Sequence, residues 1–250
     1  MNKKTNEVNE SKLAKQEEYK ILTVSKEDME EFQETVQENT GGELGFSSFL
    51  KIKVPTGGGI FWSLFNPETG EEESTKQFTG VVIKKQTTRG YWEGAMTSEN
   101  KKPLCSSGDG INGTLYGSCT TCPKSKFQNN EIPECKERQL IYILREGSLL
   151  PTVLSVPRTS MKNFRIYGAN LLGLGKRISS VITKFTLEKK VSGAGQEYSE
   201  VKFTMHEQVS KEEAKMIRAT FTPLVENVMQ HMAEYSVTDA TDEDTLNTSE

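Results

Sequence analysis

The residues best suited to chemistry are four cysteines, and all of them fall in one polar stretch of the chain. Cys119 and Cys122 form a C-x₂-C pair, and Cys105 and Cys135 flank this pair with 13 and 12 intervening residues. The residues between them are mainly Gly, Ser, Asn, Asp, Pro and Lys, which offer little material for a hydrophobic core. Four thiolates around one tetrahedral Zn²⁺ would hold such a loop together. The spacing therefore predicts one structural zinc ion bound by all four cysteines.

Other uses of these cysteines stay open at this level. Two disulfides would also use all four thiols, but they need an oxidising compartment, and the N-terminus lacks the apolar segment of a signal peptide. A redox-active C-x₂-C pair would leave Cys105 and Cys135 without a role. A catalytic zinc is disfavoured, because four cysteine ligands leave no position for water or substrate.

Charge is distributed unevenly along the 250 residues, although the net charge is only −4. Residues 1–40 carry six Lys against ten Asp or Glu, and residues 234–250 carry six acids and no base. The middle of the chain, 41–233, therefore has a net charge of +6. A basic middle between two acidic ends indicates an anionic partner for the middle and an interaction role for the tail.

Composition and patterning divide the chain into four parts. Hydrophobic residues make up only 34%, which favours a modest core with disordered flanks. We expect an acidic, largely disordered arm over 1–40 with a short helix at about 26–38, a core over 41–208, a helix over 209–233 and a disordered acidic tail over 234–250. No apolar run approaches the roughly 20 residues of a membrane helix. Without a signal or anchor, we expect a cytoplasmic protein that does not bind membranes.

The core has the pattern of several strands with one helix among them. Apolar and basic residues alternate over 49–54, which fits a strand, and a triple glycine follows at 57–59. The pattern then predicts the order β-β-β-α-β-β, over residues 78–85, 90–96, 139–146, 161–172 (the helix), 180–190 and 198–207. A tight turn at Gln86–Arg89 would join the first two of these strands, and the cysteine-rich segment would be inserted after the second.

This order is that of an OB-fold, a five-stranded Greek-key barrel with a helix between its third and fourth strands. We therefore expect a mainly β protein of the α+β class. In detail, the expected fold is a five-stranded OB-fold barrel with a zinc-loop insertion at 105–135 and a C-terminal helix.

With these elements in place, the chain resembles the single-stranded DNA-binding proteins of tailed bacteriophages over about 41–250. The resemblance rests on the four-cysteine insertion, the segment PTVLSVPRTSMKNF at 151–164 and the acidic tail at 239–250. It implies sequence-independent binding of single-stranded DNA in phage replication or recombination, in the host cytoplasm. It also implies that the tail recruits replication or recombination proteins. One departure is the end of the chain, Asn247-Thr-Ser-Glu250, where cellular single-strand binders usually have a hydrophobic residue.

The residue types agree with that resemblance, because sequence-tolerant binding of a single strand needs cations for the phosphates and aromatic faces for the bases. The aromatic candidates are Phe61, Trp62, Tyr91, Trp92 and Tyr142. The basic candidates are Lys84, Lys85, Arg89, Lys101, Lys102, Arg145, Arg158, Lys162, Arg165, Lys176 and Arg177. The partner-binding candidates in the tail are Asp239, Asp242, Glu243 and Asp244. Strand aromatics more often belong to the core and surface lysines are often only solvated, so the set as a whole carries the prediction.

An enzyme is not expected. The two histidines, His206 and His231, lie in a predicted strand and a predicted helix, and the chain contains no nucleophile elbow and no H-E-x-x-H motif. Two other classes of protein remain as alternatives. One is a zinc-containing protein-interaction or transcription-regulatory module that docks through the zinc loop. The other is an inhibitor of a host nuclease whose acidic ends mimic DNA.

Overall fold

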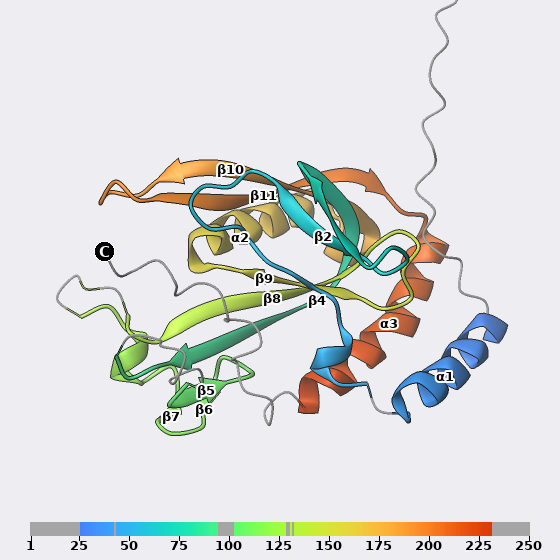
Figure 1. The fold of residues 1–250 in the computed structure, drawn as a ribbon, viewed down its shortest axis with the longest axis horizontal. Helices are drawn as coiled ribbons and strands as arrows, with labels where there is room; N and C mark the ends of the chain where they lie inside the picture. The colour runs from blue at the N-terminus through green and yellow to red at the C-terminus, as the bar shows by residue number, and fades with distance from the viewer. Residues whose placement is uncertain (1–25, 43, 95–102, 129–130, 132, 232–250) are drawn as a thin grey trace, which may run out of the picture.

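The computed structural model describes residues 26–42, 44–94, 103–128, 131 and 133–231. They form a strand-dominated α+β fold whose main sheet curls into a half-barrel (Figure 1), so the expected class is confirmed. The strands are β1 (Lys51–Ile52), β2 (Trp62–Asn66), β3 (Glu71–Thr75), β4 (Gln77–Tyr91), β5 (Cys105–Ser107), β6 (Asn112–Gly113), β7 (Gly117–Ser118), β8 (Lys136–Leu144), β9 (Thr152–Val156), β10 (Val181–Val191) and β11 (Glu197–Gln208). The helices are α1 (Lys26–Thr40), α2 (Arg158–Gly173) and α3 (Lys211–His231), with short 3₁₀ turns η1 (Phe46–Ser48), η2 (Pro123–Ser125) and η3 (Ile178–Ser180). The predicted disorder of the N-terminal start and of the acidic tail concerns residues outside the described ranges.

The long strand β4 organises the main sheet. Among the described residues this sheet has the order β1-β9-β8-β4-β10-β11, and β5 also pairs with β4. Along one edge β4 pairs with β8, while on the other edge Gln77–Val81 pair with β10 and Arg89–Tyr91 pair with β5. The register with β8 shifts between Val82 and Lys84. Such irregularities bend a strand and increase its twist, which is what a curled sheet requires.

The predicted hairpin over 78–96 is wrong. Gln86 and Arg89, expected at the two ends of a turn, lie inside β4 and pair with Leu140 and Glu137 of β8. The polar run stays extended because strand partners satisfy its backbone and because the buried Gln86 side chain has its own hydrogen-bond partners. The cysteine-rich insertion consequently lies between β4 and β8, the first and second strands of the meander, and not between the second and third.

The concave side of the half-barrel encloses an aromatic core. Phe78 of β4 and Phe185 of β10 stack with ring centroids 4.6 Å apart, and Trp62 of β2 meets Phe78 edge-on at 5.0 Å. Through Trp62 and Leu64, the β2–β3 hairpin covers this core. Helix α2 closes it with the apolar stripe predicted from the sequence, which comprises Met161, Phe164, Tyr167 and Leu171.

The convex side is covered by α3. Ile217 and Phe221 pack against Val81 and Ile83 of β4, and later turns of α3 pack over β8 and β9. Ser210 caps this helix through the predicted reciprocal bonds, in which the Glu213 amide donates to Ser210 Oγ at 3.1 Å and the Ser210 amide donates to Glu213 Oε2 at 2.9 Å. The predicted C-terminal helix and the predicted helix near 26–38 are both confirmed.

Candidate nucleic-acid interface and cysteine arm

A groove of about 630 Å³ runs along the seam where the two edges of the half-barrel approach each other. We call it the seam groove. One wall comes from the adjacent strands β1, β9 and β8, and the β2–β3 hairpin and the start of β11 also contribute to the lining. It is lined by Lys51, Lys53, Val54, Pro55, Thr56, Gly57, Phe61, Ser63, Glu72, Arg138, Ser155, Pro157, Thr159, Gln196, Glu197, Tyr198 and Ser199.

The glycine-rich loop after β1 bridges the two edges at this seam. The hydroxyl of Ser199 in β11 donates a hydrogen bond to the carbonyl oxygen of Gly59 at 2.8 Å. Gly58 has a φ of 76°, and a Cβ there would come within 2.9 Å of the Lys189 side chain of β10. Only glycine suits that backbone conformation and that close approach. The triple glycine therefore lets this loop lie close to β10 and β11 beside the groove.

Three cations stand on one wall of the seam groove. Lys51 in β1 and Lys53 just after it alternate with Ile52, whose side chain is buried in the barrel core. Arg138 reaches the same wall from β8. The Lys51 ammonium also lies over the Phe46 ring, 4.9 Å from its centroid. Alternation along β1 thus presents two lysines to the groove while the intervening isoleucine anchors the strand.

Aromatic faces complete this groove. Phe61 is 47% exposed, and Tyr198 is half-buried at the start of β11. The Lys76 ammonium lies 5.7 Å from the Phe61 ring centroid. The seam groove therefore combines cations with an accessible aromatic ring, which are the two features that a single nucleic-acid strand requires.

Most aromatic candidates from the sequence lie elsewhere. Trp62 and Tyr142 have exposed fractions of 0% and belong to the core, and Tyr91 and Trp92 are also buried. Because a base can stack only on an accessible face, Trp62 and Tyr142 cannot form the platform that the sequence predicted. They were misjudged because a strand residue faces either core or solvent, and the sequence alone did not show which face of β2 or β8 is covered. Phe61 remains as the accessible candidate.

The basic candidates are scattered over several surfaces. Lys84 pairs with Glu226 of α3, Arg89 pairs with Glu137 at 2.7 Å, and Lys176 donates to Gln208. Exposed side chains are those of Lys85, Lys162, Arg165 and Arg177, whereas Arg145 is half-buried. Arg158 lies 5.8 Å from the ring centroid of Phe127, next to the groove residues Pro157 and Thr159. Lys101 and Lys102 lie outside the described residues. None of the basic candidates within the described residues lines the seam groove itself.

Four groove residues were therefore missed: Lys51, Lys53, Arg138 and Tyr198. A signal existed for the two lysines, since they alternate with apolar residues in a predicted strand just before the triple glycine. No comparable signal marked Arg138 or Tyr198, because they come from strands far apart in the chain and meet only at the seam.

The cysteine arm comprises the described residues between Pro103 and Cys135. It consists of β5, the small β6–β7 ladder and η2, joined by turns. Asp109 orders the first turn, because its carboxylate accepts bonds from the amides of Ile111 and Asn112 at 2.7 and 2.8 Å. Burial would raise the pKa of Asp109, but these amide bonds and bonds from the Ser107 and Asn112 side chains lower it to about 2. Hydrogen bonding to the charged form thus dominates this turn.

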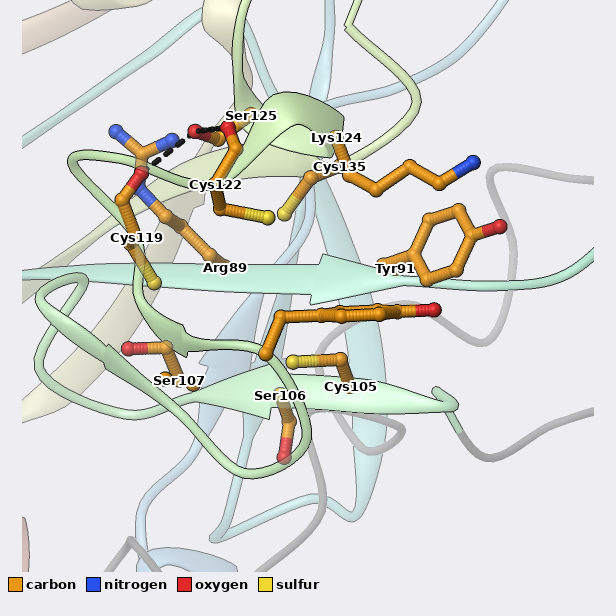
Figure 2. Close-up of a pocket in the computed structure, with 13 residues that line it drawn as sticks. Arg89, Tyr91, Cys105, Ser106, Ser107, Cys119, Cys122, Lys124, Ser125 and Cys135 are labelled. Atoms are coloured by element: carbon orange, nitrogen blue, oxygen red, sulfur yellow. Dashed lines mark hydrogen bonds between the residues drawn. The ribbon is translucent and has the colours of Figure 1, made fainter.

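All four cysteines line one cavity of about 10 Å³ in this arm, which is room for roughly one water-sized sphere. Figure 2 shows them around the cavity, with Ser125 Oγ donating to the carbonyl oxygens of Cys119 and Cys122 at 2.6 and 2.8 Å. All four are free thiols. Burial raises the pKa of the Cys135 thiol to about 11, against the lowering effect of the Arg89 guanidinium, and the other three cysteines add to the rise.

The cysteine arm has the donor set for a metal ion but not its geometry. In the part of the chain that the structure describes, no three His, Cys, Asp or Glu side chains are grouped so that they could hold a metal ion. The cavity has room for a single ion, and its four thiols are of the type that binds structural zinc, since cysteine thiolates are the usual ligands of such sites.

No protein-family model, curated protein or solved structure matches this chain. Over the described residues, no helix has both the length and the apolar character needed to cross a membrane. Function must therefore be inferred from the seam groove and the cysteine arm.

Proposed function

We propose that this protein binds single-stranded DNA without sequence preference, through the seam groove. The observation that carries the proposal is the meeting of Lys51, Lys53 and Arg138 on one wall with the exposed ring of Phe61. Phosphates would lie along the three cations, and a base would stack on Phe61. Such binding needs no catalytic group, so we propose a binding protein and not an enzyme.

The sheet order supports an OB-type barrel as the scaffold. If β4, β8, β9, β10 and β11 are numbered one to five, their order in the sheet is 3-2-1-4-5, and α2 lies between the third and fourth. OB-folds bind oligonucleotides on the face of strands two and three, between the loops that join strands one to two and four to five. Arg138 and Ser155 of the seam groove come from strands two and three, and Gln196 comes from the loop between strands four and five. The groove is therefore where such a barrel would bind a strand.

The remaining exposed cations would extend the path along α2. Arg158 packs on Phe127 of the cysteine arm at the groove's end, and Lys162 and Arg165 follow on the exposed side of the same helix. We propose that a strand leaving the groove continues over these residues. The affinity of these cations for the strand should fall as the salt concentration rises, because phosphates that bind Lys or Arg release their counterions.

We propose that one Zn²⁺ held by Cys105, Cys119, Cys122 and Cys135 stabilises the cysteine arm beside this path. The ion would supply positive charge that compensates four thiolates in a buried cavity.

The acidic tail, with Asp239, Asp242, Glu243 and Asp244, lies outside the described residues. We propose that it recruits replication or recombination proteins, and deletion of 236–250 should abolish their capture without preventing strand binding.

The test is a titration of fluorescently labelled oligo-dT, followed by anisotropy at two salt concentrations. We expect Lys53→Ala with Arg138→Ala to weaken binding and to flatten the salt slope by about 0.7 per lost phosphate contact. Phe61→Ala should lose roughly 1–3 kcal/mol of stacking. The matched control is Lys211→Ala with Lys215→Ala, which removes the same charge from exposed positions of α3. Equal effects of the two double variants, or no oligo-dT binding at low salt, would contradict the proposal.

A protein-docking role for the cysteine arm is the second candidate. Several large hydrophobic side chains are exposed there, namely Leu104, Ile111, Leu115, Tyr116 and Phe127. Exposed apolar clusters often mark protein interaction sites. If the arm is the only functional surface, the unmodified protein should not bind oligo-dT. The double variant Ile111→Ser, Leu115→Ser should then abolish capture of a protein partner.

A further inference from the structure

Charges of both signs line the seam groove. The cations are Lys51, Lys53 and Arg138, and the carboxylates are those of Glu72 in β3 and Glu197 in β11. The charge of Glu197 is compensated by Lys189, whose ammonium lies 2.6 Å from its carboxylate. Glu72 accepts a hydrogen bond from the neutral Ser63 hydroxyl, and no ion pair to it occurs among the described residues. Glu72 therefore presents an uncompensated negative charge to the groove.

This carboxylate is held by a well-anchored hairpin. Trp62 and Leu64 of β2 are buried in the barrel core, so β3 is fixed to the core through its ladder with β2. Glu72 lies opposite Phe65 in that ladder, and Ser63 on the neighbouring strand orients its carboxylate. On the same hairpin, the Asn66 side-chain amide donates to Glu73 Oε1 at 2.8 Å. The Glu72 carboxylate is thus a fixed part of the groove lining.

We infer that Glu72 makes the seam groove select single-stranded over double-stranded DNA. This inference rests on the proposed function, since it assigns a specificity to the same groove. It makes Glu72 a specificity-determining residue: the carboxylate acts by excluding the wrong ligand, while the cations and Phe61 hold the right one.

The physical reason lies in where each ligand carries its charge. A single strand has phosphates along one edge and bases along the other, so it can turn its phosphates to the lysine wall and its bases to Phe61 and Glu72. A carboxylate is compatible with base edges, because it can accept a hydrogen bond from a base N–H, such as the amino group of cytosine or the ring N3–H of thymine. A duplex has phosphates along both edges, about one charge per 1.7 Å of its axis. Its second backbone would face Glu72, and a screened repulsion would act over a Debye length of roughly 10 Å at about 0.1 M salt.

The experiment compares Glu72→Gln and Glu72→Lys with the unmodified protein in anisotropy titrations of oligo-dT and of a blunt duplex. We expect Glu72→Gln to tighten duplex binding about threefold, the effect of removing one repulsion at roughly 6 Å in water, and Glu72→Lys to tighten it about tenfold. Oligo-dT binding should change less than duplex binding in both variants. The gain in duplex affinity of the two variants over the unmodified protein should shrink as the salt concentration is raised.

The control is Glu68→Gln, which removes the same charge from an exposed turn of the same hairpin that does not line the groove. Circular dichroism melting of each variant checks that the hairpin remains folded. Equal changes in Glu68→Gln and Glu72→Gln, or an unchanged ratio of duplex to oligo-dT affinity, would overturn the role of Glu72 while leaving the proposed function intact. Absence of oligo-dT binding by the unmodified protein would overturn both.

Discussion

The half-barrel and the cysteine arm are ordered by different physical means, although β4 pairs with strands of both. In the half-barrel, large side chains such as Trp62, Tyr142 and Phe185 are fully buried. In the arm, the buried side chains include Cys119, Cys122 and Cys135, while hydrophobic residues such as Ile111 and Phe127 are exposed. Apolar burial therefore stabilises the barrel, whereas turns and hydrogen bonds must stabilise the arm. The two regions should respond to different perturbations.

The largest difference should follow removal of zinc, if the proposed ion is present. Structural zinc sites contribute on the order of 10 kcal/mol, so Cys119→Ser should release the ion and open the arm. Hydrogen exchange should then lose protection at the described residues from 103 to 128, while β10 and β11 keep theirs. Metal analysis should find about one zinc per unmodified chain. Uniform loss of protection in both regions would show that the arm and barrel are one cooperative unit.

A substitution in the barrel core should instead destabilise the protein much more than a matched substitution in the arm. Phe185 has an exposed fraction of 0% and stacks on Phe78 at 4.6 Å, so Phe185→Ala should lower the free energy of unfolding by about 3–5 kcal/mol. Urea denaturation measures this value. The matched substitution in the arm is Phe127→Ala, whose ring is 68% exposed, and we expect a change within about 0.5 kcal/mol. Comparable losses for both substitutions would contradict the contrast between the regions.

A buried hydrogen-bond chain joins the two regions and should couple them. Tyr142 Oη donates to Gln86 Oε1 at 2.8 Å, and Gln86 Nε2 donates to the carbonyl oxygen of Gly108 in the arm at 2.6 Å. Gln86→Ala removes the acceptor of the Tyr142 hydroxyl and the donor to Gly108, so it should cost about 1–3 kcal/mol and weaken exchange protection near Gly108.

Tyr142→Phe serves as its control, because it removes the hydroxyl whose acceptor Gln86→Ala takes away. The double variant Gln86→Ala, Tyr142→Phe should therefore recover part of the stability that Gln86→Ala loses, as measured by a double-mutant cycle. Strict additivity of the two substitutions would show that the bond between these side chains does not connect barrel and arm.

The smallest effect concerns the turn at Asp109 and depends on pH. Its pKa is lowered from 3.8 to about 2 in the folded protein, so its contribution is fully present above about pH 4 and is lost as the pH falls toward 2. Because this carboxylate is exposed, we expect Asp109→Asn to cost only about 1 kcal/mol at neutral pH. The exchange protection of the Ile111 and Asn112 amides is measured in Asp109→Asn and in the unmodified protein. The difference in protection between the two proteins should narrow between pH 4 and pH 2, and a constant difference would contradict the assigned hydrogen bonds.

Local sequence signals determined much of the fold. The β10–β11 hairpin, the apolar stripe of α2 and the capping box of α3 at Ser210 and Glu213 all occur where the pattern predicted them. These features depend on residues within a few positions of one another, so periodicity and capping chemistry suffice to predict them. The four cysteines line a common cavity, while their joint binding of zinc stays a prediction.

Only the tertiary structure decided which polar run would stay extended and which faces would be covered. Gln86–Arg89 has the composition of a turn, yet strand partners on its edges and a buried partner for Gln86 keep it in β4. Trp62 and Tyr142 are buried because other elements cover them, which their own neighbours in sequence do not indicate. The seam groove brings Lys53, Arg138 and Tyr198 together from positions far apart in the chain. Such a juxtaposition is set by how the sheet curls, because closing a barrel joins edges that the linear pattern leaves separate.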